Sequence, residues 1–147
     1  MLKRLDSERI SLIQEYCLER FGINQEKLEN YRWYRGSKNR IYIGPEELER
    51  IKPESIGLCV FRLDKTPKPT TNFLQLFGIH ITKNIVEISS EETIEYCAGK
   101  ILSLNLNTEP GFVIVKHRDR ILGCGHWNGN LIKNQIPKSR FCKINFL

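Results

Sequence analysis

The sequence of 147 residues lacks any apolar run close to the roughly 20 residues that a membrane-spanning helix needs. Residues 1–6 lead straight into a charged amphipathic stretch and contain no apolar segment of the kind found in secretory signals. These absences predict a cytoplasmic protein with no membrane partner. The 40% hydrophobic and 27% charged residues are typical of a folded chain, and the length suits one ordinary domain or two small ones.

Close pairs of metal-ligating side chains are also missing. The five cysteines are odd in number and widely spaced, and the pair Cys124 and His126 has no matching second half. We therefore expect buried free thiols, no bound metal and no cofactor. The glycines around Cys124 lack the spacing of a phosphate-binding loop, and close packing of strands explains them better. A small enzyme with Cys124 as nucleophile and His126 as base stays a third hypothesis, without a convincing triad.

Acidic residues are absent from residues 120–147, although the chain has 17 Asp and Glu beside 23 Lys and Arg, for a net charge of +6. Phosphate contacts need a surface free of competing carboxylates, so RNA contact is favoured here over a merely solvated basic face. The basic residues of this segment are Arg120, Lys133, Lys138, Arg140 and Lys143. Trp127 is its candidate platform for stacking a base.

Local patterns predict mixed helices and strands in the first part of the chain. The expected elements are a helix over 7–20, a helical turn within 25–30, a hairpin over 31–43, a short helix from 44 and a strand over 57–63. Ser7 is the expected cap of the first helix and Gly22 its stop, while Pro45 opens the short helix. Residues 64–71 are expected to form an exposed polar loop.

The predicted hairpin interleaves cations with aromatic rings. RNA recognition commonly pairs cations for phosphates with flat rings for unpaired bases. The alternative is an aromatic face in the core and a solvated basic face, and because strand side chains alternate, both can hold. The candidate RNA contacts in this hairpin are Arg32, Trp33, Arg35, Lys38 and Arg40.

The pattern changes from residue 83 onward. The expected elements are a strand over 84–88, a helix through Ala98 capped by Ser89 or Ser90, an extended segment over 100–106, a hairpin of 111–117 with 120–125, and last strands at 131–132 and 141–147. Several short strands with one helix in this length predict a small, partly open barrel.

An ordered set of features from Gly111 onward resembles a known family. A Gly-aromatic start, a Val-Ile-Val strand and a charged turn precede the Gly-Cys-Gly segment at 123–125, and residues 129–134 and 137–140 follow. This order resembles the PUA-like domain at the C-terminal end of the RsmF type of Sun-family ribosomal RNA 5-methylcytosine methyltransferases. It is similar also to two-domain ribosome-biogenesis proteins of the Nip type. The resemblance implies an α+β protein: a small N-terminal α/β domain over 1–82, then a PUA-type β-barrel over 83–147.

The same resemblance implies a function. It suggests binding of structured RNA, ribosomal or transfer RNA, during maturation, modification or ribosome biogenesis. Lys133, Asn134, Lys138 and Arg140 lie on the matching segment, and Lys100 follows a helix-to-strand corner that lies near bound RNA in PUA domains. For Gly99 at this corner, an ordinary helix cap is an equally good explanation.

Catalysis is not expected from this resemblance. The methyltransferases carry a large S-adenosylmethionine-binding domain with a Pro-Cys catalytic motif, and none of the five cysteines here follows a proline. We therefore expect a non-catalytic binder. The alternative is a protein-interaction subunit that targets a separately encoded RNA methyltransferase or ribosome-assembly factor, with residues 64–71 and the first helix as docking surfaces.

Overall fold

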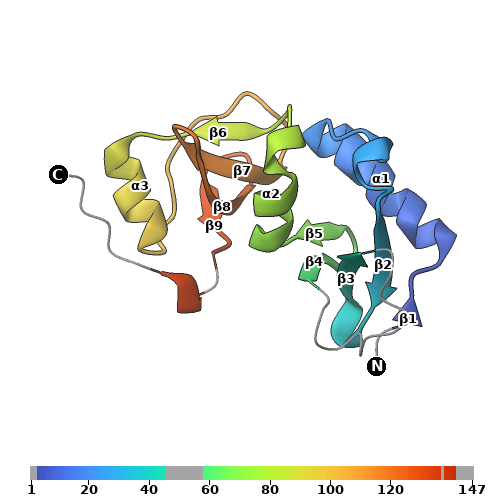
Figure 1. Ribbon diagram of the computed structural model, residues 1–147. Helices are drawn as coiled ribbons and strands as arrows, with labels where there is room; N and C mark the ends of the chain where they lie inside the picture. Colours follow the sequence, from blue (N-terminus) through green and yellow to red (C-terminus); the bar gives the residue numbers. More distant parts are fainter. Residues whose placement is uncertain (1–2, 46–57, 137, 142–147) are drawn as a thin grey trace. The chain divides into compact units, whose positions relative to one another are not determined.

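The computed structural model describes residues 3–45, 58–136 and 138–141 (Figure 1). The chain divides into two compact units, Met1–Lys83 and Asn84–Leu147, and each has its own sheet. Both units combine helices with strands, which confirms the expected mixed composition. Within the described ranges, no helix has the length and apolar character to cross a membrane.

The first unit contains a five-stranded sheet of order β1-β2-β3-β4-β5. All neighbouring strands are antiparallel, so this unit is of the α+β type and the expected α/β label is wrong. The expected hairpin over 31–43 is confirmed as β2 and β3. The strands are β1 (Lys3–Arg4), β2 (Tyr31–Arg35), β3 (Arg40–Pro45), β4 (Leu58–Leu63) and β5 (Pro67–Pro69).

Two expectations about proline in this unit are wrong. Pro45 is the last residue of β3 and does not open a helix; residues 46–48 of the expected helix lie outside the described residues. Pro67 and Pro69 belong to a strand, β5, and not to a loop. β5 is at the edge of the sheet, the position where a residue without a backbone N–H is tolerated.

The helices of the first unit begin and end at identifiable caps. Helix α1 (Ser7–Phe21) is capped by Asp6 and not by Ser7, because the Asp6 carboxylate accepts a hydrogen bond from the Arg9 backbone N–H. Gly22 ends α1 with a left-handed φ of 69°, as expected. A short 3₁₀ helix, Gln25–Lys27, supplies the expected helical turn. Helix α2 (Thr71–Phe77) was not anticipated; Thr70 caps it.

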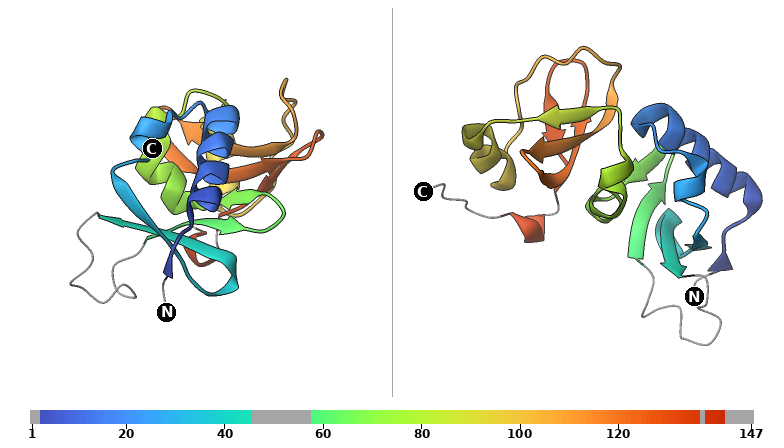
Figure 2. Two further views of the ribbon diagram at one scale, coloured as in Figure 1. Left: turned by 90° about the vertical axis from the view of Figure 1, so that its right-hand side faces the viewer. Right: turned by 45° about the horizontal axis from the view of Figure 1, so that its top comes forward.

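Both helices pack on one face of the five-stranded sheet (Figure 2). Phe61 of β4 is at the centre of this core. Its ring centroid is 4.4 Å from that of Phe73 in α2 and 6.2 Å from that of Tyr16 in α1. The ring centroid of Trp33 in β2 is 6.5 Å from that of Phe61, across the intervening strand β3. The opposite face of the sheet therefore points away from α1 and α2.

The second unit contains a four-stranded sheet of order β6-β7-β8-β9. β6 runs parallel to β7, and β7 and β8 form the expected hairpin. Helix α3 begins with a capping box, in which Ser89 and Glu92 satisfy each other's backbone N–H groups. The elements are β6 (Ile85–Glu87), α3 (Ser90–Cys97), β7 (Gly111–His117), β8 (Arg120–Trp127), β9 (Ile132–Asn134) and a 3₁₀ turn, η6 (Lys138–Arg140).

The described strands of this unit form an open sheet, so the expected barrel is not closed in the part of the chain that the structure describes. The segment 100–106 contributes one isolated bridge, between Leu102 and Ile132. Of the expected last strand, Phe141 is in no strand and residues 142–147 lie outside the described residues.

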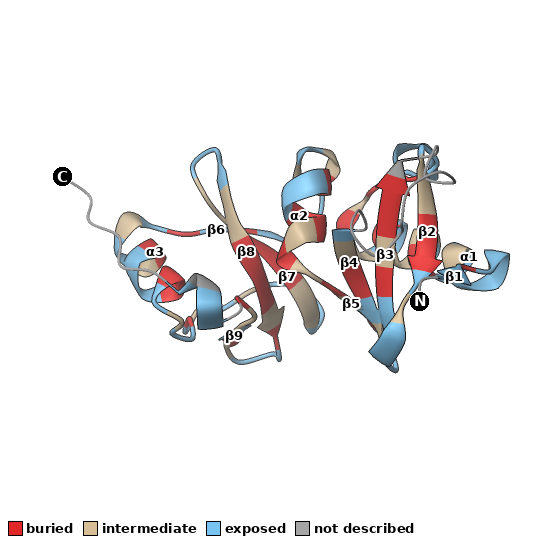
Figure 3. Cartoon of the chain, turned by 60° about the horizontal axis from the view of Figure 1, so that its bottom comes forward, coloured by how far each residue is buried: buried red, intermediate tan, exposed pale blue. Residues whose placement is uncertain are grey.

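A single buried cluster holds the second unit together (Figure 3). Gly125 lies within it, and a side chain at that position would overlap Ile132, so close strand packing explains this glycine as expected. The Tyr96 hydroxyl donates to the carbonyl oxygen of Cys124 at 2.5 Å, and burial raises the Tyr96 pKa. The cluster comprises Val86, Ile88, Tyr96, Leu102, Val113, Val115, Trp127, Ile132 and Ile136.

Candidate nucleic-acid interface

The two tryptophans proposed as RNA contacts are part of the cores. Trp127 is 2% exposed, and its indole N–H donates to the carbonyl oxygen of Thr108 at 3.1 Å. Trp33 is 5% exposed and donates in the same way to Leu28 at 3.4 Å. An indole ring enclosed in this way has no open face for a base to stack on. The expectation that Trp127 and Trp33 act as stacking platforms is therefore wrong.

Asn134 ties β9 to the corner that follows α3. Its side-chain amide donates to the backbone carbonyl oxygens of Tyr96 at 2.6 Å and Lys100 at 3.1 Å. Its carbonyl oxygen accepts the Ile136 N–H at 2.9 Å. Asn134 thus places Lys100 beside β9, and its amide is already engaged by the protein backbone. The structure gives it a positioning role.

Gly99 and Phe141 bring a second basic segment to the same corner. Gly99 has a φ of 95°, and a side chain there would overlap the Phe141 ring. Glycine is needed because this ring packs on it, which explains the residue without RNA. The Phe141 N–H donates to the Lys138 carbonyl oxygen at 3.2 Å, so η6 and its exposed Lys138 are held next to exposed Lys100.

The third basic side chain, Lys133, lies in a row across the sheet. In the strand register Phe112 is opposite His126, and His126 is opposite Lys133. The Phe112 and His126 rings meet edge to face with centroids 4.8 Å apart. Both rings are half-buried and Lys133 is exposed. Because Asn134 points to the core, its neighbour Lys133 points to the opposite face of β9.

The sequence did not predict this ring pair, because a β-bulge determines which residues of β7 and β8 are opposite each other. The register shifts between Val115 and Lys116. Without that shift, the turn would place Phe112 opposite Gly125 and leave His126 without this partner. The aromatic after Gly111 was visible in the sequence, but its partner could be found only from the bulge.

The family described as "Methyltransferase RsmF PUA domain" matches residues 83–141. Residues 83–141 form a PUA-like domain of the RsmF type. The match includes α3, the corner at Gly99, the β7–β8 hairpin, β9 and η6.

Three relatives of the chain are each named ribosomal RNA small subunit methyltransferase F. The protein from Aeromonas hydrophila subsp. hydrophila is 25% identical over 108 residues, which cover 70% of this chain and 23% of that protein. The protein from Vibrio atlanticus is 36% identical over 55 residues, 37% of this chain and 12% of its own length. The protein from Vibrio parahaemolyticus is 37% identical over 60 residues, which cover 37% of this chain and 13% of that protein. The chain thus spans less than a quarter of these relatives.

Arg140 belongs to the PUA-like domain, in η6, and its side chain lies outside the description. The remaining proposed residues lie in the first unit, outside that domain. Arg32 and Arg40 lie on the sheet face away from the helices, whereas Trp33 and Arg35 alternate onto the other face. Lys38 is exposed in the hairpin turn with a φ of 56°.

The four described cysteines form no disulfide with one another. Cys17 lies on the buried side of α1, and this burial raises its thiol pKa to about 12. Burial also raises the pKa of Cys59. Cys124 is 1% exposed, while His126 contacts Phe112. Within the described residues, no group of three or more His, Cys, Asp or Glu is arranged to hold a metal ion.

Proposed function

We propose that this chain binds structured RNA through the PUA-like domain and does not itself catalyse a reaction. The observation that carries the proposal is a basic edge on a domain of RNA-methyltransferase type. We define the basic edge as Lys100, Lys133 and Lys138, all exposed. Cations at this edge can attract phosphates and release condensed counterions on binding.

Two positioning contacts support this proposal. Asn134 fixes the Lys100 corner against β9, and Phe141 on Gly99 fixes η6 and Lys138. Backbone positions held by such contacts need little further ordering when a ligand binds, which favours affinity. The Phe112–His126 ring pair beside Lys133 adds partly accessible aromatic surface of the kind that contacts unstacked bases.

Ribosomal RNA is the favoured ligand, with transfer RNA as the second. The matched relatives are named as methyltransferases of small-subunit ribosomal RNA, and this chain resembles less than a quarter of each. We therefore place its role in ribosomal RNA maturation or modification. A separately encoded RNA methyltransferase or ribosome-assembly factor is the partner that such a binding module would serve.

The test is a titration of the full chain with small-subunit ribosomal RNA and with transfer RNA at several salt concentrations. We expect affinity to fall steeply with salt, and the double variant Lys133→Gln/Lys138→Gln to flatten the log–log slope by about 1.4–1.8. The matched control Lys3→Gln/Lys27→Gln removes the same charge from exposed sites in the first unit and should keep the wild-type slope. Salt-insensitive binding, or equal slopes for both variants, would refute the proposal.

A further inference from the structure

The five-stranded sheet of the first unit has a second face, opposite α1 and α2, with an unusual set of side chains. Strand register places Tyr34 opposite Tyr42, and Arg40 opposite Arg62, which is in turn opposite Lys68. Arg4 is opposite Tyr34 on the outer strand. We call this surface the open face, and its members are Arg4, Arg32, Tyr34, Arg40, Tyr42, Arg62 and Lys68.

Burial agrees with this assignment of faces at the cations, whereas Tyr34 is only 7% exposed. Arg4, Arg40 and Arg62 are exposed, whereas the residues that alternate with them, such as Ile41 and Phe61, are fully buried. A bulge in β4 sets Val60 beside Phe61, and both are 0% exposed.

No strand of this sheet contains Asp or Glu in its described residues. One acid, Asp64, pairs with Arg62 at 3.6 Å, where both side chains are about half exposed. Such an exposed pair contributes little to stability, and Asp64 offsets one of the five positive charges of the face. The described acids of the unit lie in or near α1, in the helical turn after it, or in the β4–β5 turn. They are Asp6, Glu8, Glu15, Glu19, Glu26, Glu29 and Asp64.

Arg40, Arg62 and Lys68 form a row of three cations on adjacent strands. Neighbouring strands are about 4.8 Å apart, so the three side chains repel one another across the sheet. Directly opposed like charges destabilise a sheet. This row of cations does not stabilise the fold, but a polyanion bound across β3, β4 and β5 would offset the repulsion between them.

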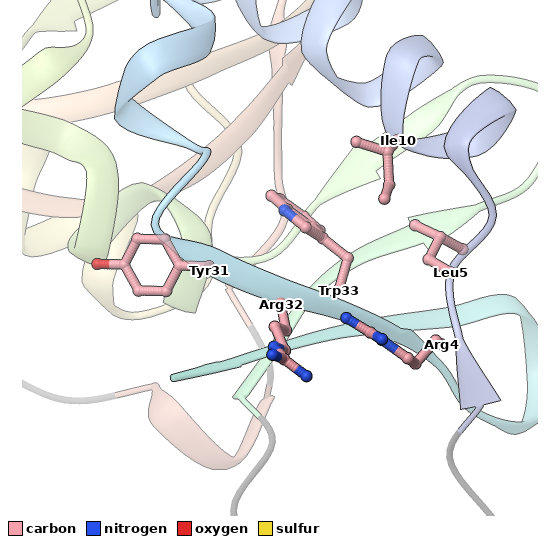
Figure 4. A pocket seen from close by; sticks show the side chains of 6 residues that line it. All are labelled: Arg4, Leu5, Ile10, Tyr31, Arg32 and Trp33. Atoms are coloured by element: carbon pink, nitrogen blue, oxygen red, sulfur yellow. The ribbon is translucent and has the colours of Figure 1, made fainter. Parts of the chain in front are cut away.

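A groove lined by two further cations of the open face lies at the outer edge of the sheet (Figure 4). It has a volume of about 450 Å³ and is lined by Arg4 and Arg32 together with Tyr31 and the apolar Leu5 and Ile10. In Figure 4 the Trp33 ring points toward Ile10, on the other side of β2 from the Arg32 guanidinium. The groove thus joins cationic groups to an apolar wall.

We propose that the open face is a second RNA-binding surface, which takes a single-stranded segment. Four of its five cations are arginine, whose planar guanidinium binds phosphate with two hydrogen bonds and stacks on bases. Tyr42, half-buried at the centre, adds a ring. Cations that follow a backbone beside aromatic faces are the combination that single strands require. An acidic protein would use the charges but not the rings. This proposal goes beyond the PUA-like domain and does not depend on it.

The experiment measures the full chain against an unstructured 12-nucleotide oligouridine by fluorescence anisotropy at low salt. The test variant is Arg40→Gln/Arg62→Gln, and the control is Lys3→Gln/Lys27→Gln, which removes two exposed cations outside the open face of the same unit. We expect the test variant to lose about tenfold or more in affinity and to flatten the salt slope by about 1.4, the value for two phosphate contacts on a single strand. The control should change neither.

Stability supplies the second readout. Because Arg40 and Arg62 are opposed, their replacement should leave the free energy of unfolding unchanged or raise it, so weaker binding would not reflect unfolding. Equal affinity in the test variant and the control overturns the proposal, as does binding of an acidic peptide in place of oligouridine. Loss of binding in Lys133→Gln/Lys138→Gln alone would support the PUA-like domain and reject the open face. Loss in Arg40→Gln/Arg62→Gln alone would support the open face, and the titration with ribosomal RNA would still decide the role of the PUA-like domain.

Discussion

The side-chain amide of Asn134 donates a hydrogen bond of 2.6 Å to the backbone carbonyl oxygen of Tyr96, the last-turn residue of α3. The same amide reaches Lys100 at 3.1 Å. One side chain therefore joins the end of a helix, the corner after it and the edge strand β9. The basic edge depends on this link, because Lys100 is positioned by it and Lys133 is the preceding residue.

Replacing Asn134 tests this link. Asn134→Ala should lower the free energy of unfolding of the PUA-like domain by about 1–3 kcal/mol, because partly buried carbonyl oxygens lose their donor. Asn130→Ala, at an exposed position, should stay within about 0.5 kcal/mol of the wild type. Urea unfolding followed by Trp127 fluorescence in a Trp33→Phe background measures both. If Asn134→Ala weakened RNA binding with no loss of stability, Asn134 would be a direct RNA contact.

The Gly99 corner gives a second prediction. Gly99→Ala should destabilise the domain by about 1–3 kcal/mol, because the residue has a positive φ and the new methyl group would overlap the Phe141 ring. In Phe141→Ala the overlap is gone, so Gly99→Ala should cost less there. A double-mutant cycle gives the coupling, and a coupling of zero would show that Phe141 does not pack on Gly99 in solution.

Some of this architecture follows from local sequence signals. Ser89 and Glu92 predict the start of α3 because their side chains satisfy neighbouring N–H groups, and the structure confirms the cap. The β7–β8 hairpin follows from alternation around a charged turn. Helix α2 was missed although Phe73, Leu74 and Phe77 have helical spacing, because the preceding prolines suggested a loop.

Other features depend on contacts between distant residues. Trp33 lies among cations in the sequence and Trp127 in a segment without acids, and only packing decides that their rings are buried. The bulge between Val115 and Lys116 pairs Phe112 with His126, and no local pattern indicates it. The row of Arg40, Arg62 and Lys68 likewise needs the strand register, since these residues are far apart along the chain.

Burial of Trp127 makes a spectroscopic prediction. In the Trp33→Phe background, its emission should be poorly quenched by acrylamide and should not change when saturating RNA is added, because the indole is 2% exposed. Trp127→Ala should lose about 3–5 kcal/mol of stability through the cavity it leaves. Strong quenching of Trp127 by RNA would restore it as a stacking platform.

Burial of Cys17 predicts how stability depends on pH. Its folded pKa of about 12 lies above the ordinary value of 9.0, so folding favours the protonated thiol. This contribution is complete below about pH 9 and should then fall by roughly 1.4 kcal/mol per pH unit as the pH rises toward 12. Urea unfolding of the first unit between pH 8.5 and 10.5, about the lower half of that window, should show a flatter decline in Cys17→Ala. Parallel declines would contradict the assignment.

Lysine footprinting tests most directly whether the PUA-like domain binds RNA through its basic edge. The full chain is acetylated with and without small-subunit ribosomal RNA, and mass spectrometry measures the modification of each lysine. We predict that RNA protects Lys100, Lys133 and Lys138, whereas exposed Lys27 reacts equally in both samples. Uniform reactivity of all these lysines, or protection confined to Lys27, would contradict the account.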